Sequence, residues 1–410
     1  MKEPKIRFKG FSGEWKRSTL GDLALFSKGS GYSKSDICKE GTPVILYGRM
    51  YTKYQSVFDE IDTFVNPKDN SVVSKGGEVI IPGSGESSED ISLAAMVKNE
   101  GVILGGDLNI LKFNQKVNDP TFMSMAITYS PTRAELSSYS QGKTVVHLRN
   151  SEIAKGTIRY PNISEQNTIV NYVLSLDAQI SASTSRLASL KQVKAASLQA
   201  MFPQEGETVP KVRFKGFEGE WKKVKLSECL EISTTRNLNN EYGVNEVLSV
   251  SDEEGVMNQI KLLGRSYAGK SVTNYKILRT NQVVYTKSPL KAKPYGIVKV
   301  NKGETGIVSV LYAVYDAKEC VSPDYIHYYF EPTFRINNYL LPLINKGAKN
   351  TMNISDEVSL QGDIILPNTL EEQLRIVEYL QSLDRQIALH TQRLEKLKQI
   401  KAACLDKMFV

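Results

Sequence analysis

Residues 161–202 read PNISEQNTIVNYVLSLDAQISASTSRLASLKQVKAASLQAMF, and residues 367–409 repeat this pattern as PNTLEEQLRIVEYLQSLDRQIALHTQRLEKLKQIKAACLDKMF. In both copies the apolar residues alternate at spacings of four and three, which is the a/d pattern of a coiled coil. We therefore predict two long helices of roughly 38 residues, each about 55–60 Å long. The expected helix–helix seam consists of Ile169, Val173, Leu176, Ile180, Leu187, Leu190, Ile376, Leu380, Leu383, Ile387, Leu394 and Leu397.

Each long segment carries start signals, and the first also carries a stop signal. Residues 162–165 and 369–372 form capping patterns, Asn to Glu and Thr to Glu, whose side chains can bind free N–H groups in the first helical turn. Pro203 follows the first copy and cannot continue a helix.

The duplication extends beyond the helices. The segment PKIRFKGFSGEW at residues 4–15 returns as PKVRFKGFEGEW at residues 210–221, and each copy ends in one of the two tryptophans of the chain. A period of roughly 206 residues is too long for a solenoid repeat and indicates a duplicated domain. We expect a globular domain at residues 1–160, a long helix at 161–205, a second domain at 206–366 and a second helix at 367–410.

Two similar halves favour a pseudo-twofold arrangement in which the long helices pair antiparallel along their apolar seams. The alternative is that each helix packs only against its own domain. Within the domains, β-branched runs predict buried strands, and short helices are expected around 123–129 and 325–330. The expected fold class is therefore α+β, with two similar α/β domains joined by two long antiparallel helices in a coiled coil.

Composition restricts the class of protein. The chain has 52 Lys and Arg against 45 Asp and Glu, a net charge of +7 that suggests either a polyanionic partner or simply a basic surface. There is no apolar run of membrane-spanning length, and the N-terminus is polar, so neither a span nor a secretory signal is expected. Four scattered cysteines fit a reducing cytoplasm, and three separated histidines favour no metal site.

Three short motifs resemble catalytic signatures, and each is incomplete. Gly142-Lys143-Thr144 lacks the earlier glycine of a phosphate-binding loop, and Gly83-Ser84-Gly85 lacks the spacing of a nucleophile elbow and indicates a tight turn. Asp119-Pro120-Thr121-Phe122 lacks the second proline of a methyltransferase loop and is better explained as a turn before a short helix. The sequence therefore favours a binding protein over an enzyme.

Basic and aromatic residues interleave with Ser, Asn and Gly in both globular parts. Lys and Arg neutralise phosphates, whereas Asn, Arg and Ser can read base edges in the major groove. Taken singly, each could be a solvated surface group, and the tyrosines could pack in the core. The candidate DNA-binding residues are Lys28, Ser30, Tyr32, Arg49, Tyr51, Lys53, Lys143, Thr144, Arg236, Asn237, Lys287, Lys291, Lys293, Lys346, Lys349 and Asn350.

The chain resembles the specificity subunit of Type I restriction–modification systems over essentially its whole length. The resemblance rests on the repeated R-F-x-G-F-x-G-E-W motif, the P-x-x-x-E-Q helix start at 161–166 and the K-Q-x-K-A-A…M-F endings at 191–202 and 398–409. It implies a non-catalytic subunit whose two target recognition domains, at 1–160 and 206–366, each read one half of an asymmetric site on double-stranded DNA.

The same resemblance implies the partners. The two helices would act as a spacer and dock two modification (methyltransferase) subunits, which use S-adenosylmethionine. Restriction subunits, ATP-dependent translocases and endonucleases, would use ATP and Mg²⁺, and no cofactor is expected in this chain. The alternatives are a coiled-coil scaffold without DNA recognition and a fused restriction or methylation enzyme.

Overall fold

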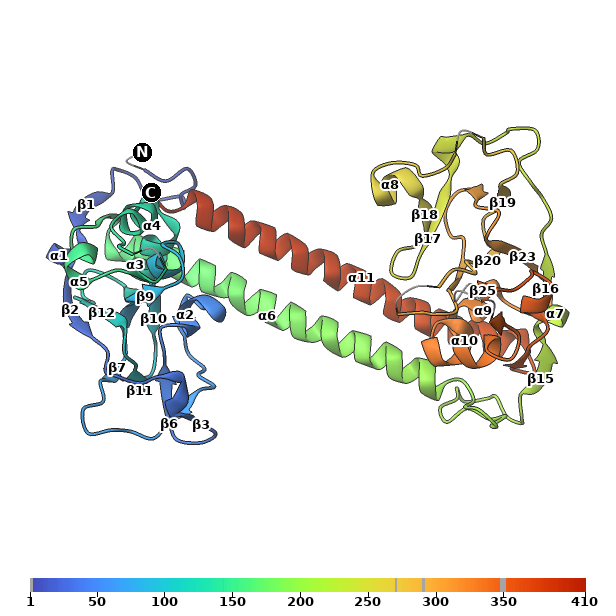
Figure 1. The fold of residues 1–410 in the computed structure, drawn as a ribbon, viewed down its shortest axis with the longest axis horizontal. Helices are drawn as coiled ribbons and strands as arrows, with labels where there is room; N and C mark the ends of the chain where they lie inside the picture. Colours follow the sequence, from blue (N-terminus) through green and yellow to red (C-terminus); the bar gives the residue numbers. More distant parts are fainter. Residues whose placement is uncertain (1–2, 143, 270, 290–291, 347–351) are drawn as a thin grey trace. The chain divides into compact units, whose positions relative to one another are not determined.

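The computed structural model describes residues 3–142, 144–269, 271–289, 292–346 and 352–410, and it divides into two compact units (Figure 1). Unit 1 comprises residues 1–184 and 392–410, and unit 2 comprises residues 185–391. The boundary cuts both long helices, α6 (Ile163–Ala200) and α11 (Leu370–Lys407), each of 38 residues. Each unit therefore combines one globular part with a portion of both helices.

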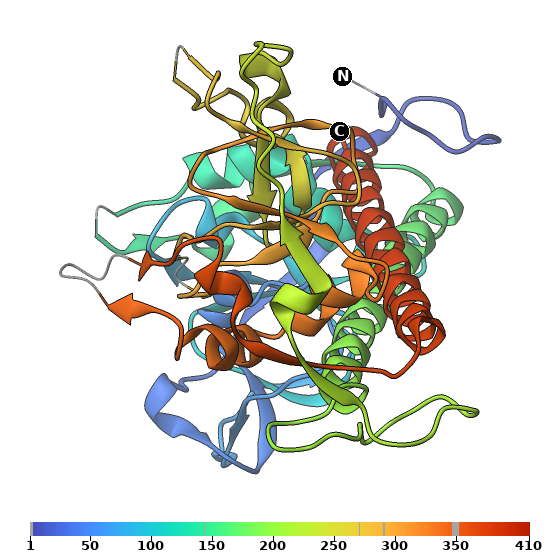
Figure 2. The same cartoon turned by 90° about the vertical axis from the view of Figure 1, so that its right-hand side faces the viewer.

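Within each unit the two helices pack side by side and antiparallel (Figure 1 and Figure 2). In unit 1, Lys401 near the end of α11 forms an ion pair with Asp177 in the first half of α6. In unit 2, Lys194 near the end of α6 lies 2.7 Å from Asp384 in the first half of α11. The helices do not pack only on their own domains, which confirms the expected fold class with two long antiparallel helices.

The expected seam residues differ in burial along the helices. Ile180, Leu187 and Ile387, which lie toward the helix centres, are half-buried. The others are buried: Ile169, Val173, Leu176, Leu190, Ile376, Leu380, Leu383, Leu394 and Leu397. The strongest burial is at the helix starts, where Val173 and Leu380 are fully covered because each also packs into the core of a globular part.

Unit 1 is built on two five-stranded sheets of mixed direction, ordered β2-β12-β8-β10-β5 and β3-β6-β4-β11-β7. Strand β8 is buried along its whole length because its EVIIP sequence carries apolar residues on both faces. The helices are α1 (Leu20–Leu23), α2 (Arg49–Thr52), α3 (Pro120–Tyr129), α4 (Pro131–Ser138) and α5 (Asn150–Ile153), with 3₁₀ turns η1 (Lys34–Asp36) and η2 (Asp90–Ser92). The strands are β1 (Lys16–Thr19), β2 (Ala24–Lys28), β3 (Ile37–Cys38), β4 (Thr42–Ile45), β5 (Val57–Phe58), β6 (Phe64–Val65), β7 (Val73–Lys75), β8 (Glu78–Pro82), β9 (Ser84–Gly85), β10 (Ala95–Val97), β11 (Glu100–Leu104), β12 (Leu108–Phe113), β13 (Val146–His147) and β14 (Thr157–Tyr160).

Unit 2 repeats the same plan with a smaller, antiparallel central sheet ordered β16-β23-β20-β21. The ribbon β15·β26 corresponds to β1·β14 of unit 1. Its helices are α7 (Leu226–Cys229), α8 (Gln259–Leu263), α9 (Pro323–Phe330) and α10 (Thr333–Leu340), with 3₁₀ turns η3 (Val244–Glu246) and η4 (Val358–Leu360). Its strands are β15 (Lys222–Lys225), β16 (Leu230–Ile232), β17 (Leu248–Ser251), β18 (Gly255–Asn258), β19 (Lys276–Leu278), β20 (Val283–Tyr285), β21 (Val298–Val300), β22 (Gly306–Val308), β23 (Ala313–Ala317), β24 (Asn345–Lys346), β25 (Met352–Asn353) and β26 (Asp363–Leu366).

The start of each long helix is held by the repeated N-terminal motif. The expected caps are present, since Asn162 Oδ1 and Thr369 Oγ1 accept bonds from the backbone N–H three residues on. The glutamates of the two caps form ion pairs that the capping pattern does not predict. Glu165 forms a bidentate ion pair with Arg7 at 2.7 and 2.8 Å, and Glu372 forms the same pair with Arg213.

The glutamine that follows each glutamate fixes a short helix of the globular part. Gln166 Oε1 accepts from the backbone N–H of Asp119, which is the N-cap of α3, and Gln373 Oε1 accepts in the same way from Ser322, the N-cap of α9. The Asp119-Pro120 motif is therefore a helix start, as the sequence indicates. The adjacent E-Q residues tie each long helix to the N-terminal motif and to a short helix of its domain.

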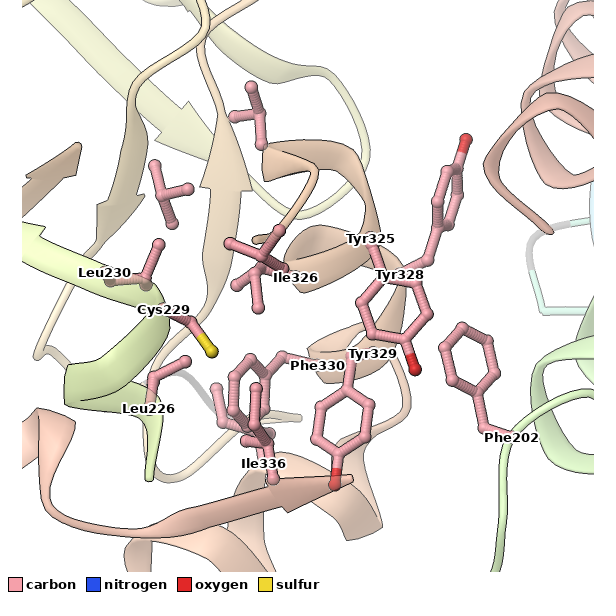
Figure 3. Packing of buried hydrophobic residues seen from close by; sticks show 14 of the residues in the cluster. Phe202, Leu226, Cys229, Leu230, Tyr325, Ile326, Tyr328, Tyr329, Phe330 and Ile336 are labelled. Carbon is pink, nitrogen blue, oxygen red and sulfur yellow. The ribbon is translucent and has the colours of Figure 1, made fainter. Parts of the chain in front are cut away.

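The end of each long helix supplies an aromatic residue to a core. Phe202, after α6, is fully buried in unit 2, and its ring centroid lies 5.4 Å from that of Tyr325 (Figure 3). Phe409, after α11, is buried in unit 1 with its centroid 5.6 Å from that of Phe122. Each helix thus begins in the core of one unit and ends in the core of the other.

Candidate nucleic-acid interface

Unit 1 contains a groove of about 1120 Å³ whose walls carry aromatic and charged side chains. It is formed by the loop that leads from β2 into η1, by the segment from β4 through α2, and by the turn between β11 and β12. Four of the sequence-predicted DNA-binding residues line it: Tyr32, Arg49, Tyr51 and Lys53. The groove also contains residues that the sequence-based list omits, namely Lys34, Asp36, Tyr47, Asp62, Glu86 and Asp107.

Tyr32 is fixed in the wall of this groove. Its hydroxyl bonds with Ser71 Oγ and accepts from the backbone N–H of Lys68 at 2.7 Å, while the Lys68 ammonium lies 4.6 Å from the ring centroid. Lys68 also lies 2.7 Å from Asp36, and its hydrogen bond lowers the pKa of that carboxyl to about 2. The wall around Tyr32 is therefore ordered by a network of polar contacts.

Arg49 and Lys53 are brought together by Asp62. Arg49 begins α2 and Lys53 directly follows its end, and both cations form ion pairs with the same carboxylate. These two partners, Lys53 first, lower the pKa of Asp62 well below its usual range. The Arg49 side chain is only 9% exposed, whereas those of Lys53 and Asp62 are each 59% exposed, so one cation lies at the floor and one at the rim.

The remaining candidates in unit 1 lie elsewhere. Ser30 uses its hydroxyl to accept from the backbone N–H of Val72 at 3.0 Å, which ties two loops together. Lys28 is exposed at the end of β2, and Thr144 is exposed before β13. Lys143 lies outside the described residues.

Two lysine candidates of unit 2, Lys287 and Lys293, are engaged in internal contacts. Lys287, together with Lys276, pairs with Asp356, and although burial opposes it, these two ammonium groups lower the pKa of Asp356. Lys293 lies 2.9 Å from Asp252 and also donates to the carbonyl of Glu331. Whether these cations also contact DNA stays a prediction.

Two polar candidates of unit 2 organise their own loop. Arg236 donates to the carbonyl of Asn274 at 2.9 Å. Asn237 is buried, and its amide donates to the carbonyl of Tyr242 and accepts from the same residue's N–H. Lys346 lies in β24, and Lys291, Lys349 and Asn350 lie outside the described residues.

The Gly83-Ser84-Gly85 motif is not the tight turn that its sequence indicates. Ser84 and Gly85 form β9, which pairs with β13, and Ser84 Oγ shares a 2.9 Å hydrogen bond with Nδ1 of His147. The contact is a cross-strand pair at the edge of the unit, made because the two strands run in register there.

The described residues contain neither a metal-binding cluster nor a membrane-spanning helix. Across the described ranges, no group of three or more His, Cys, Asp or Glu side chains is placed to hold a metal ion. Within the same ranges, no helix combines the length and apolar character required to cross a bilayer.

Two related α+β units, joined by antiparallel helices that both units share, define an internally duplicated protein. The model of the Type I restriction modification DNA specificity domain matches residues 12–192 and again 218–399. The two matches cover most of the chain, which therefore belongs to the family of Type I restriction–modification specificity subunits, with two copies of the DNA specificity domain.

One solved structure shows the same fold, and two others are similar to the chain over most of its length. The S subunit of the Type I restriction–modification system from M. genitalium matches with a TM-score of 0.60 at 12% identity, covering 100% of this chain and 99% of that one. The HsdS subunit from Thermoanaerobacter tengcongensis matches with a TM-score of 0.46 at 18% identity, covering 96% of each chain. A chain from a structure describing complex assembly and conformational transition of the type I R-M system matches with a TM-score of 0.48 at 17% identity, covering 96% of this chain and 97% of that one. No curated protein matches the chain.

Proposed function

We propose that each unit reads one half of an asymmetric, bipartite site on double-stranded DNA and that the two long helices set the gap between the halves. The observation that carries this proposal is the sharing of the helices. Because α6 starts in the core of unit 1 and ends in the core of unit 2, and α11 does the reverse, both long helices are common to the two units.

The divergence between the units supports an asymmetric site. The helix anchors are the same in both, as the Arg7–Glu165 and Arg213–Glu372 pairs show. The cations are held differently: Arg49 and Lys53 of unit 1 share Asp62, whereas in unit 2 Lys287 shares Asp356 with Lys276 of β19, and Lys293 pairs with Asp252. Two units with equivalent helix anchors but different candidate DNA-binding surfaces would bind two different short sequences.

The two helices repeat one sequence pattern and would present related surfaces twice, which suits two copies of a modification subunit. In this assembly the modification subunits would hold S-adenosylmethionine and the restriction subunits would hold ATP and Mg²⁺. This chain would supply recognition without catalysis, in keeping with the incomplete catalytic motifs of its sequence.

Binding of duplex DNA by the full chain, assembled with its modification subunits, is expected to depend steeply on salt. If eight cations of the chain contact phosphates, they contribute about −7 to the slope of log affinity against log salt concentration. The first measurement is a titration, at several salt concentrations, with a duplex that carries the target. The second is a map of adenine methylation in cells with and without the gene.

The two measurements separate the candidate functions. Loss of one bipartite methylation pattern on deletion of the gene, with salt-dependent binding, is the expected result. An unchanged methylation map together with no retention of duplex at low salt would instead identify a scaffold. Methylation or cleavage by the isolated chain would identify an enzyme.

A further inference from the structure

Arg49 differs from the other cations of the groove because it is buried and fixed. Its side chain is 9% exposed although it lines an open groove. Its guanidinium carbon lies 5.6 Å from the ring centroid of Phe58, a fully buried residue of β5. Asp62 accepts a hydrogen bond from its Nη1. The aromatic ring and the carboxylate together set the direction of the guanidinium plane.

The guanidinium retains unused hydrogen-bonding capacity. It carries five N–H donors, and the bond to Asp62 comes from Nη1 alone. Its Nε is buried and has no hydrogen-bond partner among the residues that the structure describes. Buried donors are normally satisfied, so Arg49 is an unusual position, and the donors on Nη1 and Nη2 that the bond to Asp62 leaves unused are those available to an acceptor from outside the chain.

The surroundings suit a base edge more than a phosphate. The rings of Tyr47 and Tyr51 lie 6.4 Å apart beside Arg49, and both line the groove. Lys53, the residue after α2, shares Asp62 but is 59% exposed at the rim. An exposed, flexible ammonium is suited to the phosphate backbone, whereas a rigid fork at the floor is suited to a planar pair of acceptors.

We propose that Arg49 reads a guanine in the major groove within the half-site of unit 1, with Asp62 as its positioning residue. The fork of a guanidinium matches O6 and N7 of guanine, which are two acceptors on one base edge. This inference rests on the proposed function, because it names the base that the groove of unit 1 would recognise.

The test selects from a library of randomised duplexes with the full chain assembled with its modification subunits. Arg49→Met keeps the apolar stem on Phe58 and removes the fork. One G·C position in one half of the selected motif should become degenerate, the other half should stay unchanged, and affinity for the wild-type motif should fall roughly 5- to 150-fold.

A matched control is Lys98→Met. Like Arg49, Lys98 is a cation of unit 1 paired with an aspartate, at 2.5 Å from Asp59, but it does not line the groove. This variant should select the wild-type motif. Thermal melting of each variant monitors folding, and Arg49→Lys provides a second variant that keeps the charge but lacks the planar pair of donors, so it should lose the same position.

The outcomes distinguish the two levels of the proposal. If the wild-type assembly selects no motif, the proposed function itself fails. If Arg49→Met or Arg49→Lys folds and selects the unchanged motif, Arg49 does not read a base. An equal loss of affinity for all duplexes, with the motif retained, would make Arg49 a phosphate contact and would also overturn the inference.

Discussion

Phe202→Ala is expected to lower the free energy of unfolding of unit 2 by about 3–5 kcal/mol. The side chain is fully buried, and its ring lies against Tyr325, Tyr329 and the guanidinium of Arg335. Alanine would remove the dispersion contacts of a whole ring and leave a cavity that the surrounding aromatic side chains can fill only partly. Because Phe202 follows α6, the substitution also weakens the anchor of this helix in unit 2.

Urea unfolding followed by tryptophan fluorescence measures this effect. Unit 2 contains Trp221, so Trp15→Phe in both proteins leaves a single reporter in the affected unit. Phe334→Ala is the control in the same unit; this ring is 40% exposed, and its removal should cost less than about 1 kcal/mol. A similarly small effect for Phe202→Ala would mean that the end of α6 is not part of the core of unit 2.

Arg213→Met should destabilise unit 2 by about 3–5 kcal/mol, because it leaves the buried carboxylate of Glu372 without its charge partner. Glu372 is only 2% exposed, and it is bound by Nε and Nη2 of Arg213 and, at 3.3 Å, by the indole N–H of Trp221. Methionine keeps most of the apolar stem of arginine, so the loss reports the ion pair rather than packing.

The same fluorescence measurement applies, with a double-mutant cycle as its control. Arg213→Met combined with Glu372→Met removes both charges and should restore much of the lost stability, since no unpaired buried charge remains. Lys215→Met removes an exposed cation two residues away and should change little. Additive effects of the two single substitutions would show that the pair is not coupled.

The features that the sequence predicts best are those with a local pattern. The seam of the long helices repeats within each segment, so residues such as Val173 and Leu380 can be assigned to a buried face from spacing alone. The caps at Asn162 and Thr369 depend on a partner only three residues away. Strand β8 and helix α3 also follow from short runs of apolar residues and from a proline at the helix start.

Contacts across long sequence separations could not be predicted from the same patterns. The partner of Glu165 is Arg7, 158 residues away, and the only signal is that both residues recur in the second half. The candidate site shows the same limit. Lys287 has a DNA-binding composition around it, yet its ammonium lies 2.6 Å from Asp356, a carboxylate that nothing in the local sequence connects to it.

In unit 1 the sequence clusters of Tyr, Arg and Lys predict part of the lining of the groove. Tyr32, Arg49, Tyr51 and Lys53 converge there because strands β4 and β11 bring their flanking loops to one side of the unit. The sequence does not single out Asp62, because an aspartate between strands usually marks a solvated turn. Its role is visible only once both cations are placed beside it.

The central claim is that the shared helices set the gap between two half-sites. The most direct test inserts seven residues, two helical turns that keep the a/d pattern, between Thr184 and Ser185 and between Thr391 and Gln392, where the boundary of the units cuts both helices. Genome-wide maps of adenine methylation would then be compared between cells that carry the original and the lengthened chain. The account predicts the same two half-site sequences separated by about three more base pairs, since seven residues add about 10 Å of helix. A methylated site with an unchanged gap would contradict it.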